Sequence, residues 1–319
     1  MTLARRVSRY LVLGVLGCTS GCRFHFDSVS TPDAALADAP LADAAIDVPP
    51  PDGPCVLGAW TEPADDPRFA QVNTTTAIEW SGELSDDGLR VIFASNRASV
   101  SGDAVEHLYT AQRASRMAAF APATFLAINS DTAHDSEPSF NATELYFVSN
   151  RGPSGTDCIY VAPRTATPDM WGTPRRLDAL CTGDQKLGGL YISRDGQHLY
   201  YDNDGQVVMA QRGATEFDTP GTPVLGVLSE MRFCTLTGDE LTIYCETSVV
   251  NGQPTQLWQA SRASLTAQFT NAGQVPDLDT TGRFVGDPAI SSDGTLLLYA
   301  SGPDSSTGQD LRLAERTCP

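Results

Sequence analysis

Residues 84–97 read LSDDGLRVIFASNR, and this stretch decides the fold. Its Asp87-Gly88 pair supplies the positive φ that a tight hairpin turn needs. The β-branched and aromatic residues that follow favour a pleated, half-buried strand. A second strand pattern, HLYTAQR, follows at residues 107–113 and ends in a basic residue. The unit is therefore predicted to be a β-meander.

The same pattern recurs along the chain. Its further copies lie at residues 138–164, 192–212, 237–262 and 288–316. Gly88 and Gly294 stand 206 residues and four intervals apart, so one repeat takes about 51 residues, as propeller blades do. A single meander buries too little surface, and radial stacking protects its edges. We therefore expect an all-β propeller of five blades, with six as the alternative, and few helices.

The repeats resemble the WD-repeat-like propeller repeats of the TolB type, in which P-x-[LIF]-S-x-D-G leads into L-Y-F-x-S-x-R. Residues 147–152, FVSNRG, and 290–294, ISSDG, carry this resemblance best, and it covers roughly residues 56–319. It implies an exported propeller, exposed to the periplasm or envelope, that binds a partner. It does not imply catalysis.

The N-terminus has the features of an export signal. Arg5, Arg6 and Arg9 precede a short apolar run at residues 10–17. Eight apolar residues cannot span a hydrocarbon core about 30 Å thick. We therefore assign residues 1–22 to a signal peptide.

The apolar run ends at two cysteines that resemble the lipobox of bacterial lipoproteins. Cys18 has the apolar Val15 three places before it, whereas Cys22 follows the small Ser20-Gly21 pair. Cleavage before Cys22 leaves six cysteines, an even number, which favours Cys22 as the lipidated residue. Cys18 and a plain secretory signal are the alternatives. The protein is expected to be exported and lipid-anchored to the bacterial envelope, at the outer membrane, on its periplasmic or surface face.

A tether separates this signal from the repeats. Residues 23–54 are rich in Ala, Asp and Pro and hold almost no aromatic side chain after the first few positions. Like charges repel, and proline favours an extended chain, so we expect a solvated, disordered tether. The propeller domain then spans residues 55–319.

Charge and motifs exclude several classes of function. Acidic residues outnumber basic ones by 39 to 21, and the formal net charge of −18 argues against a nucleic-acid partner. The motifs G-x-S-x-G, H-E-x-x-H and G-x-x-x-x-G-K are absent. The acidic loop at residues 202–205 lacks the glutamate of an EF-hand, and a hairpin turn explains it better. We expect no cofactor and no metal.

Propellers usually bind ligands at the mouth of the central channel, where residues enter each innermost strand. Ordinary blade packing with solvated charges is the alternative explanation of the polar residues at these positions. The candidate channel-mouth residues are Glu79, Trp80, Asp135, Glu137, Glu230, Arg232 and Asp287.

The ring is expected to close through the N-terminal segment. Residues 69–73 are similar in place to residues 125–129, whereas the last repeat stops without an outer strand. The N-terminal segment should therefore supply the missing strand of the last blade. This closure would bring Cys55 near Cys318, where a disulfide would join the two ends of the ring.

The remaining cysteines are expected to pair within blades. Cys234 and Cys245 lie on neighbouring strands of one predicted hairpin, and Cys158 and Cys181 fall on successive strands of the second blade. Free buried thiols are a weak alternative in an exported protein.

Two functions remain open from the sequence. The first is a monomeric, non-catalytic lipoprotein that binds or scaffolds a protein or an envelope polymer, in contact with the membrane only through its lipid. The alternative is a glycoside-processing five-bladed propeller, with Glu79, Asp135, Glu137 and Asp287 as candidate carboxylates. A glycosidase needs two such groups about 5–5.5 or 6.5–9.5 Å apart.

Overall fold

The computed structural model describes residues 56–63, 66–97, 105–167, 170–181, 183, 186–227, 229–247, 255–278, 282–304 and 308–317. The predicted signal peptide and tether, with Cys18 and Cys22, lie outside the described residues, as do Cys55 and Cys318. Their assignment, and with it the domain boundaries, stays a prediction. In the described part of the chain, no helix has the length and apolar character needed to cross a membrane.

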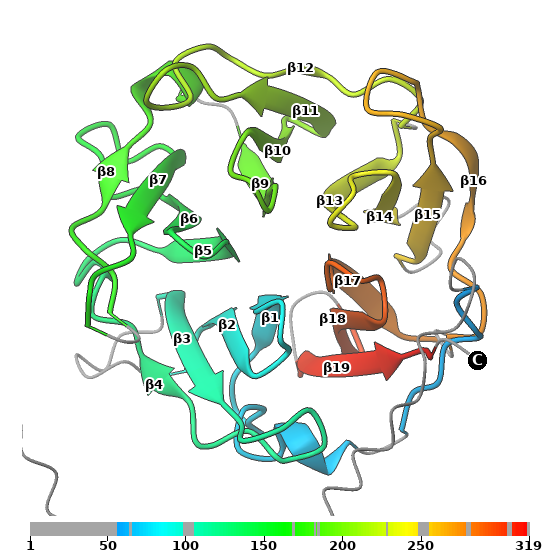
Figure 1. Ribbon diagram of the computed structural model, residues 1–319. Helices are drawn as coiled ribbons and strands as arrows, with labels where there is room; N and C mark the ends of the chain where they lie inside the picture. Colours follow the sequence, from blue (N-terminus) through cyan, green and yellow to red (C-terminus); the bar gives the residue numbers. More distant parts are fainter. Residues whose placement is uncertain are drawn as a thin grey trace, which may run out of the picture. The chain divides into compact units, whose positions relative to one another are not determined.

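The described residues form five antiparallel sheets arranged as the blades of a ring, with β1, β5, β9, β13 and β17 innermost (Figure 1). Blade one contains β1 (Glu79–Leu84), β2 (Arg90–Ser95), β3 (His107–Gln112) and β4 (Thr124–Phe125); blade two β5 (Asp135–Phe140), β6 (Glu144–Ser149), β7 (Cys158–Pro163) and β8 (Arg175–Arg176); blade three β9 (Leu187–Ile192), β10 (His198–Asn203), β11 (Gln206–Gln211) and β12 (Thr222–Pro223); blade four β13 (Met231–Leu236), β14 (Thr242–Thr247), β15 (Leu257–Ser261) and β16 (Thr270–Gln274); blade five β17 (Phe284–Ile290), β18 (Leu296–Gly302) and β19 (Asp310–Glu315). The described helical elements are two short 3₁₀ turns, η1 (Pro67–Phe69) and η2 (Asp178–Leu180). The predicted all-β propeller with five blades is confirmed.

The hydrophobic core is divided into layers between neighbouring blades. Phe93 and Leu298, for example, belong to one buried cluster that joins blades one and five. Phe147 of blade two packs in another cluster with Ile92 and Leu108 of blade one. Each blade therefore buries both of its faces against its neighbours, which is why an isolated meander would be unstable.

The Ser-x-Asp-Gly motif forms a tight turn between the first two strands. Ser85 Oγ donates a 2.6 Å hydrogen bond to Asp87 Oδ1, which also accepts the backbone N–H of Leu89. Gly88 follows with φ of 69°, where a Cβ would be strained. The equivalent side-chain pairs are Ser193–Asp195, Thr237–Asp239 and Ser291–Asp293.

The basic residue after the third strand ties that strand to the turn. Arg113 Nε donates a 2.7 Å hydrogen bond to the carbonyl of Gly88, and its guanidinium lies 4.6 Å from the centre of the Phe120 ring. The same cation–π arrangement is present in the other blades, as Arg164–Trp171, Arg212–Phe217, Arg262–Phe269 and Arg316–Trp60.

The last of these pairs shows how the ring closes. Trp60 comes from the N-terminal segment, yet it stacks on Arg316 of blade five, with 4.2 Å from the guanidinium carbon to the ring centre. Beside it, Thr61 and Glu315 exchange two backbone hydrogen bonds of 2.8 Å. The N-terminal segment therefore supplies the outer element of the last blade, as a single β-bridge rather than a full strand.

Asn73 completes the closure. Its side chain pairs with both the N–H and the carbonyl of Leu311 on β19, at 3.0 Å each. Asn129 makes the same pair of bonds with Leu108 on β3. Residues 69–73 and 125–129 therefore occupy equivalent positions, the first against β19 and the second against β3, as predicted.

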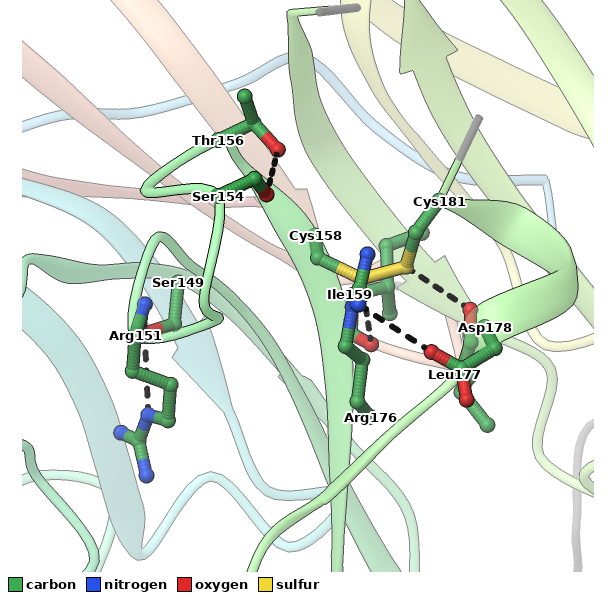
Figure 2. Close-up of a disulfide and its surroundings, with 10 residues drawn as sticks. All are labelled: Ser149, Arg151, Ser154, Thr156, Cys158, Ile159, Arg176, Leu177, Asp178 and Cys181. Atoms are coloured by element: carbon green, nitrogen blue, oxygen red, sulfur yellow. Dashed lines mark hydrogen bonds and ion pairs between the residues drawn. A yellow bond between two sulfur atoms is a disulfide. The ribbon is translucent and has the colours of Figure 1, made fainter. Parts of the chain in front are cut away.

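Two of the predicted disulfides are present in the described residues. Cys158 opens β7 and bonds to Cys181, with 5.1 Å between the Cα atoms, and Arg176 Nε donates to Cys158 Sγ at 3.0 Å (Figure 2). Cys181 follows η2 instead of lying on a strand, because β8 is only two residues long.

The second bridge joins Cys234 of β13 to Cys245 of β14, the neighbouring strands of one hairpin, as predicted. Disulfides of this kind are typical of proteins that fold in an oxidising, exported environment.

Candidate functional site

Each innermost strand carries a β-bulge at the same position. The bulge residues adopt left-handed conformations with φ between 46° and 53°; they are Ser81, Glu137, Gly189, Phe233 and Asp287. Left-handed backbone is uncommon for residues other than glycine. Its recurrence in every blade shows that it belongs to the blade geometry. A bulge re-aims a side chain, and here all five residues line one narrow space on the axis of the ring.

A larger cavity opens from this space, and we call it the axial pocket. Its volume is about 450 Å³. It combines carboxylates, one guanidinium, amides and apolar side chains. Its lining residues are Ile78, Trp80, Asn96, Glu106, Glu137, Arg232, Phe233, Glu246, Phe284, Asp287 and Gln309.

Glu137 is held by the two blades that flank its own. Its Oε1 accepts a 2.8 Å hydrogen bond from Ser81 Oγ of blade one, and its Oε2 accepts a 2.9 Å bond from the backbone N–H of Gly189 in blade three. Burial raises the pKa of Glu137 to about 8, the negative charge of Asp287 adds to the increase, and the two hydrogen bonds oppose it.

Asp287 occupies the equivalent bulge of blade five. Burial and the neighbouring Glu246 raise the pKa of its carboxyl group to about 8, and the backbone amide of Ser81 opposes the increase. Asp287 and Glu137 are both partly exposed, so each keeps an accessible edge in the axial pocket.

Glu246 brings a third carboxylate to the pocket from the end of β14. Its Oε1 accepts from Arg232 Nε at 3.1 Å, and its Oε2 accepts from the backbone N–H of Asp287 at 3.2 Å. Gly286 makes room for this side chain, because a Cβ there would lie 2.1 Å from Glu246 Oε2. Burial raises the pKa of Glu246 to about 7, although the charge of Arg232 opposes the increase.

These carboxyl groups cannot all ionise freely at neutral pH. They share one poorly solvated space, and each charge disfavours ionisation of its neighbours. The pocket therefore favours protonated carboxyl groups near neutral pH, and such groups are the proton donors of general acid catalysis.

Aromatic side chains line the same pocket. Trp80, Phe233 and Phe284 come from the inner strands of blades one, four and five. The Phe233 ring fills the space left by Gly188, where a Cβ would lie 2.5 Å from its Cε1. Such rings offer flat apolar faces beside the carboxylates.

The opposite end of the channel is crossed by an ion pair. Asp86, in the turn of blade one, accepts a 2.9 Å hydrogen bond from Arg194 Nε of blade three, and Ser292 Oγ of blade five also donates to it. Glu83 lies between this cluster and the bulges, and burial raises its pKa well above the usual value. Side chains of three blades therefore meet at this end of the channel.

Three of the predicted channel-mouth residues lie outside the pocket lining. Glu79 is fully buried and accepts from Arg97 at 2.8 Å, and Asp135 is fully buried and bonded to Arg151. Both carboxylates pair with the arginine of the Ser-Asn-Arg motif in their own blade. They therefore anchor the start of an inner strand. Glu230 is exposed and does not line the pocket either.

The structure brings the other four predicted residues, Trp80, Glu137, Arg232 and Asp287, into the axial pocket. Glu246 is not among the predicted residues, because it lies at the end of a second strand, whereas the predicted residues enter the innermost strands. The feature that could have identified Glu246 is its place in the strand pairing, where it lies directly opposite Arg232 in the β13–β14 pair. Among the described residues, no group of three or more His, Cys, Asp and Glu side chains is placed to hold a metal ion.

No protein-family model matches the chain, and no curated protein sequence matches it. Solved structures do match its fold. An α-L-arabinofuranosidase from Podospora anserina in complex with cellotriose is 12% identical, with a TM-score of 0.54 over 82% of this chain and 96% of that one. An exo-β-1,3-galactanase from Clostridium thermocellum is 13% identical, with a TM-score of 0.51 over 80% of this chain and 61% of that one. TolB from Acinetobacter baumannii is 14% identical, with a TM-score of 0.43 over 75% of this chain and 54% of that one.

These likenesses, at such low identity, concern the fold. The five-bladed architecture agrees with the propeller expected from the repeats, and TolB structures are among the matches. The expectation that the protein is not an enzyme is contradicted, because glycoside hydrolases with the same propeller fold stand among its structural neighbours. That expectation rested on missing catalytic motifs, and carboxylates that converge from separate blades leave no such motif in the sequence.

Proposed function

We propose that the protein is a carbohydrate-active propeller that hydrolyses glycosidic bonds in the axial pocket, with Glu137 and Asp287 as the acid–base pair. The single observation that carries this proposal is the convergence of Glu137, Asp287 and Glu246, from three blades, in one cavity with raised pKa values. The hydrolases among its structural neighbours act on arabinofuranosides and β-1,3-galactans, which supports a glycan substrate.

The chemistry requires two carboxyl groups in different protonation states, and the repulsion between their charges separates the two ionisation steps. The protonated one donates its proton to the leaving-group oxygen as the glycosidic bond breaks. The ionised one removes a proton from the attacking water or attacks the anomeric carbon itself, depending on the separation of the two groups. Glu246, held by Arg232, raises the pKa of Asp287 and thereby keeps a proton available at neutral pH.

The aromatic side chains supply binding. Trp80, Phe233 and Phe284 offer faces on which the apolar side of a sugar ring can pack, next to the carboxylates that bind its hydroxyl groups.

We also propose that the enzyme is exported and held at the bacterial envelope by a lipid on Cys22 or Cys18, with residues 23–54 as its tether. The two disulfides in the described residues support export. The substrate would then be a glycan polymer of the envelope or its surroundings.

The test uses the purified full-length chain in detergent with a panel of 4-nitrophenyl glycosides, including the α-L-arabinofuranoside and the β-D-galactopyranoside. Glu137→Gln and Asp287→Asn should each lower kcat/KM by about 10²–10⁴-fold on the glycoside that is cleaved. Glu230→Gln, an exposed carboxylate outside the pocket, is the matched control and should leave kcat/KM unchanged. Absence of hydrolysis across the panel and with envelope polysaccharides, or hydrolysis that survives both pocket substitutions, would refute the proposal.

A further inference from the structure

Ser81 lines the same narrow axial space as the two carboxyl groups of the proposed acid–base pair. Its Oγ donates a 2.8 Å hydrogen bond to Glu137 Oε1 of blade two. This hydrogen bond connects the bulge of blade one to the bulge of blade two.

Ser81 is the one hydroxyl residue among the five bulge positions, because the other four hold Glu137, Gly189, Phe233 and Asp287. Ser81 thus combines a hydroxyl with the left-handed backbone, φ 46°, that turns it toward the axis.

The backbone at this bulge has little freedom to move. Ser81 is 6% exposed, and the next residue, Gly82, packs so closely on blade five that a Cβ would lie 2.7 Å from Leu298 Cδ2 and 3.1 Å from Leu311 Cδ2. This close packing holds the Ser81 donor in place, as a preorganised site requires.

We infer that Ser81 is a positioning residue, which fixes the carboxyl group of Glu137 in the axial space and favours its ionised form through the hydroxyl. The inference rests on the proposed function for its catalytic meaning. Its hold on Glu137 is a property of the chain itself and is measurable without turnover.

The variants are Ser81→Ala and Ser81→Gly. Both remove the hydroxyl, and glycine accepts a φ of 46° without strain. Glu137 is titrated by ¹³C NMR of carboxyl-labelled glutamate in the full chain, with its signal assigned by Glu137→Gln. A lost hydrogen bond to a carboxylate should raise the titration midpoint of Glu137 by about one pH unit.

The pH profile of hydrolysis is the second readout. The limb that Glu137 controls should move to higher pH in both variants, on the acidic side if Glu137 is the base and on the alkaline side if it is the acid. A merely structural serine would lower activity at every pH without moving a limb.

Ser139→Ala is the matched control. Ser139 is a fully buried serine of the inner strand β5, and its hydroxyl accepts the backbone N–H of Ile192 instead of donating to a carboxylate. Its loss should lower thermal stability and leave the Glu137 titration unchanged.

An unchanged midpoint of Glu137 in Ser81→Gly would overturn the inference, as would a shift in Ser81→Ala that Ser81→Gly does not reproduce. If the wild-type chain cleaves none of the glycosides, the proposed function fails, and the titration still decides whether Ser81 holds Glu137.

Discussion

Glu246 Oε2 lies 3.2 Å from the backbone nitrogen of Asp287, so a carboxylate of blade four is bound directly to the bulge of blade five. The contact is allowed by the missing side chain at Gly286. It places two acidic groups close enough for the charge of Glu246 to raise the pKa of Asp287. The electrostatics of the axial pocket therefore depend on a contact between blades.

Replacing Glu246 with glutamine should lower the pKa of Asp287 below its value of about 8, because the neighbouring negative charge is gone while an oxygen remains for the Asp287 N–H. The alkaline limb of the pH–rate profile and the ¹³C titration of Asp287 report this shift. Glu230→Gln serves as the control. An Asp287 midpoint that stays at its wild-type pH would show that burial alone sets it.

Stability should fall as the pH rises from about 4 to about 8. The folded-state pKa values of Glu137, Glu246 and Asp287, about 8, 7 and 8, lie above the ordinary values of 4.5, 4.5 and 3.8. The folded state therefore binds more protons than the unfolded state in this window. The stabilisation is fully present at a pH below the ordinary pKa values, and it is lost as the pH rises through the raised pKa values of the folded state.

Chemical denaturation at pH 5 and pH 8 measures this difference in the free energy of unfolding. The triple variant Glu137→Gln, Glu246→Gln, Asp287→Asn mimics the protonated groups and should remove most of it. If the triple variant kept the pH dependence of the wild type, other titratable groups would be responsible for the change in the free energy of unfolding.

Replacing Trp60 with alanine should destabilise the ring at its closure by about 3–5 kcal/mol. Trp60 is 4% exposed, stacks on Arg316 and meets the Tyr244 ring edge-on, with 6.4 Å between the ring centres. Hydrogen exchange should rise in β19. Trp171→Ala, at the equivalent place in blade two, is the control, and its effect should stay within that blade. Unchanged exchange in β19 would mean that Trp60 does not hold the closure.

Non-reducing peptide mapping should find Cys158 joined to Cys181, Cys234 to Cys245 and Cys55 to Cys318. The first two pairs are bonded in the structure, and the third stays a prediction. Changing Cys234 and Cys245 together to serine should cost about 3 kcal/mol of stability, because the unfolded chain gains conformational entropy when the disulfide no longer closes its loop. A free thiol at Cys55 or Cys318 in the exported protein would contradict the third pair.

The lipid anchor has its own test. Changing both Cys18 and Cys22 to serine should release the protein from membranes into the soluble fraction, since no acylation site would remain near the cleavage point. Single substitutions identify which cysteine carries the lipid. Membrane association of the double variant would contradict the lipoprotein prediction.

The repeat unit was predictable because its determinants are local. The Ser85–Asp87 turn, the strand of residues 90–95 and the closing Arg113 all lie within one blade, and their roles follow from turn chemistry and β-propensity. Repetition then implied a ring, and the unmatched outer strand of the last repeat implied closure by the N-terminal segment. These steps need no knowledge of how one blade meets the next.

The pocket was decided only by tertiary structure, because its chemistry arises between blades. Glu79 and Glu137 look equally suitable in the sequence, yet Arg97 neutralises the first inside its own blade, whereas a bulge turns the second into the channel. Glu246 becomes part of the site through the space beside Gly286, 40 residues away. The raised pKa values come from burial and from charges on other blades, and these exist only once the ring has closed.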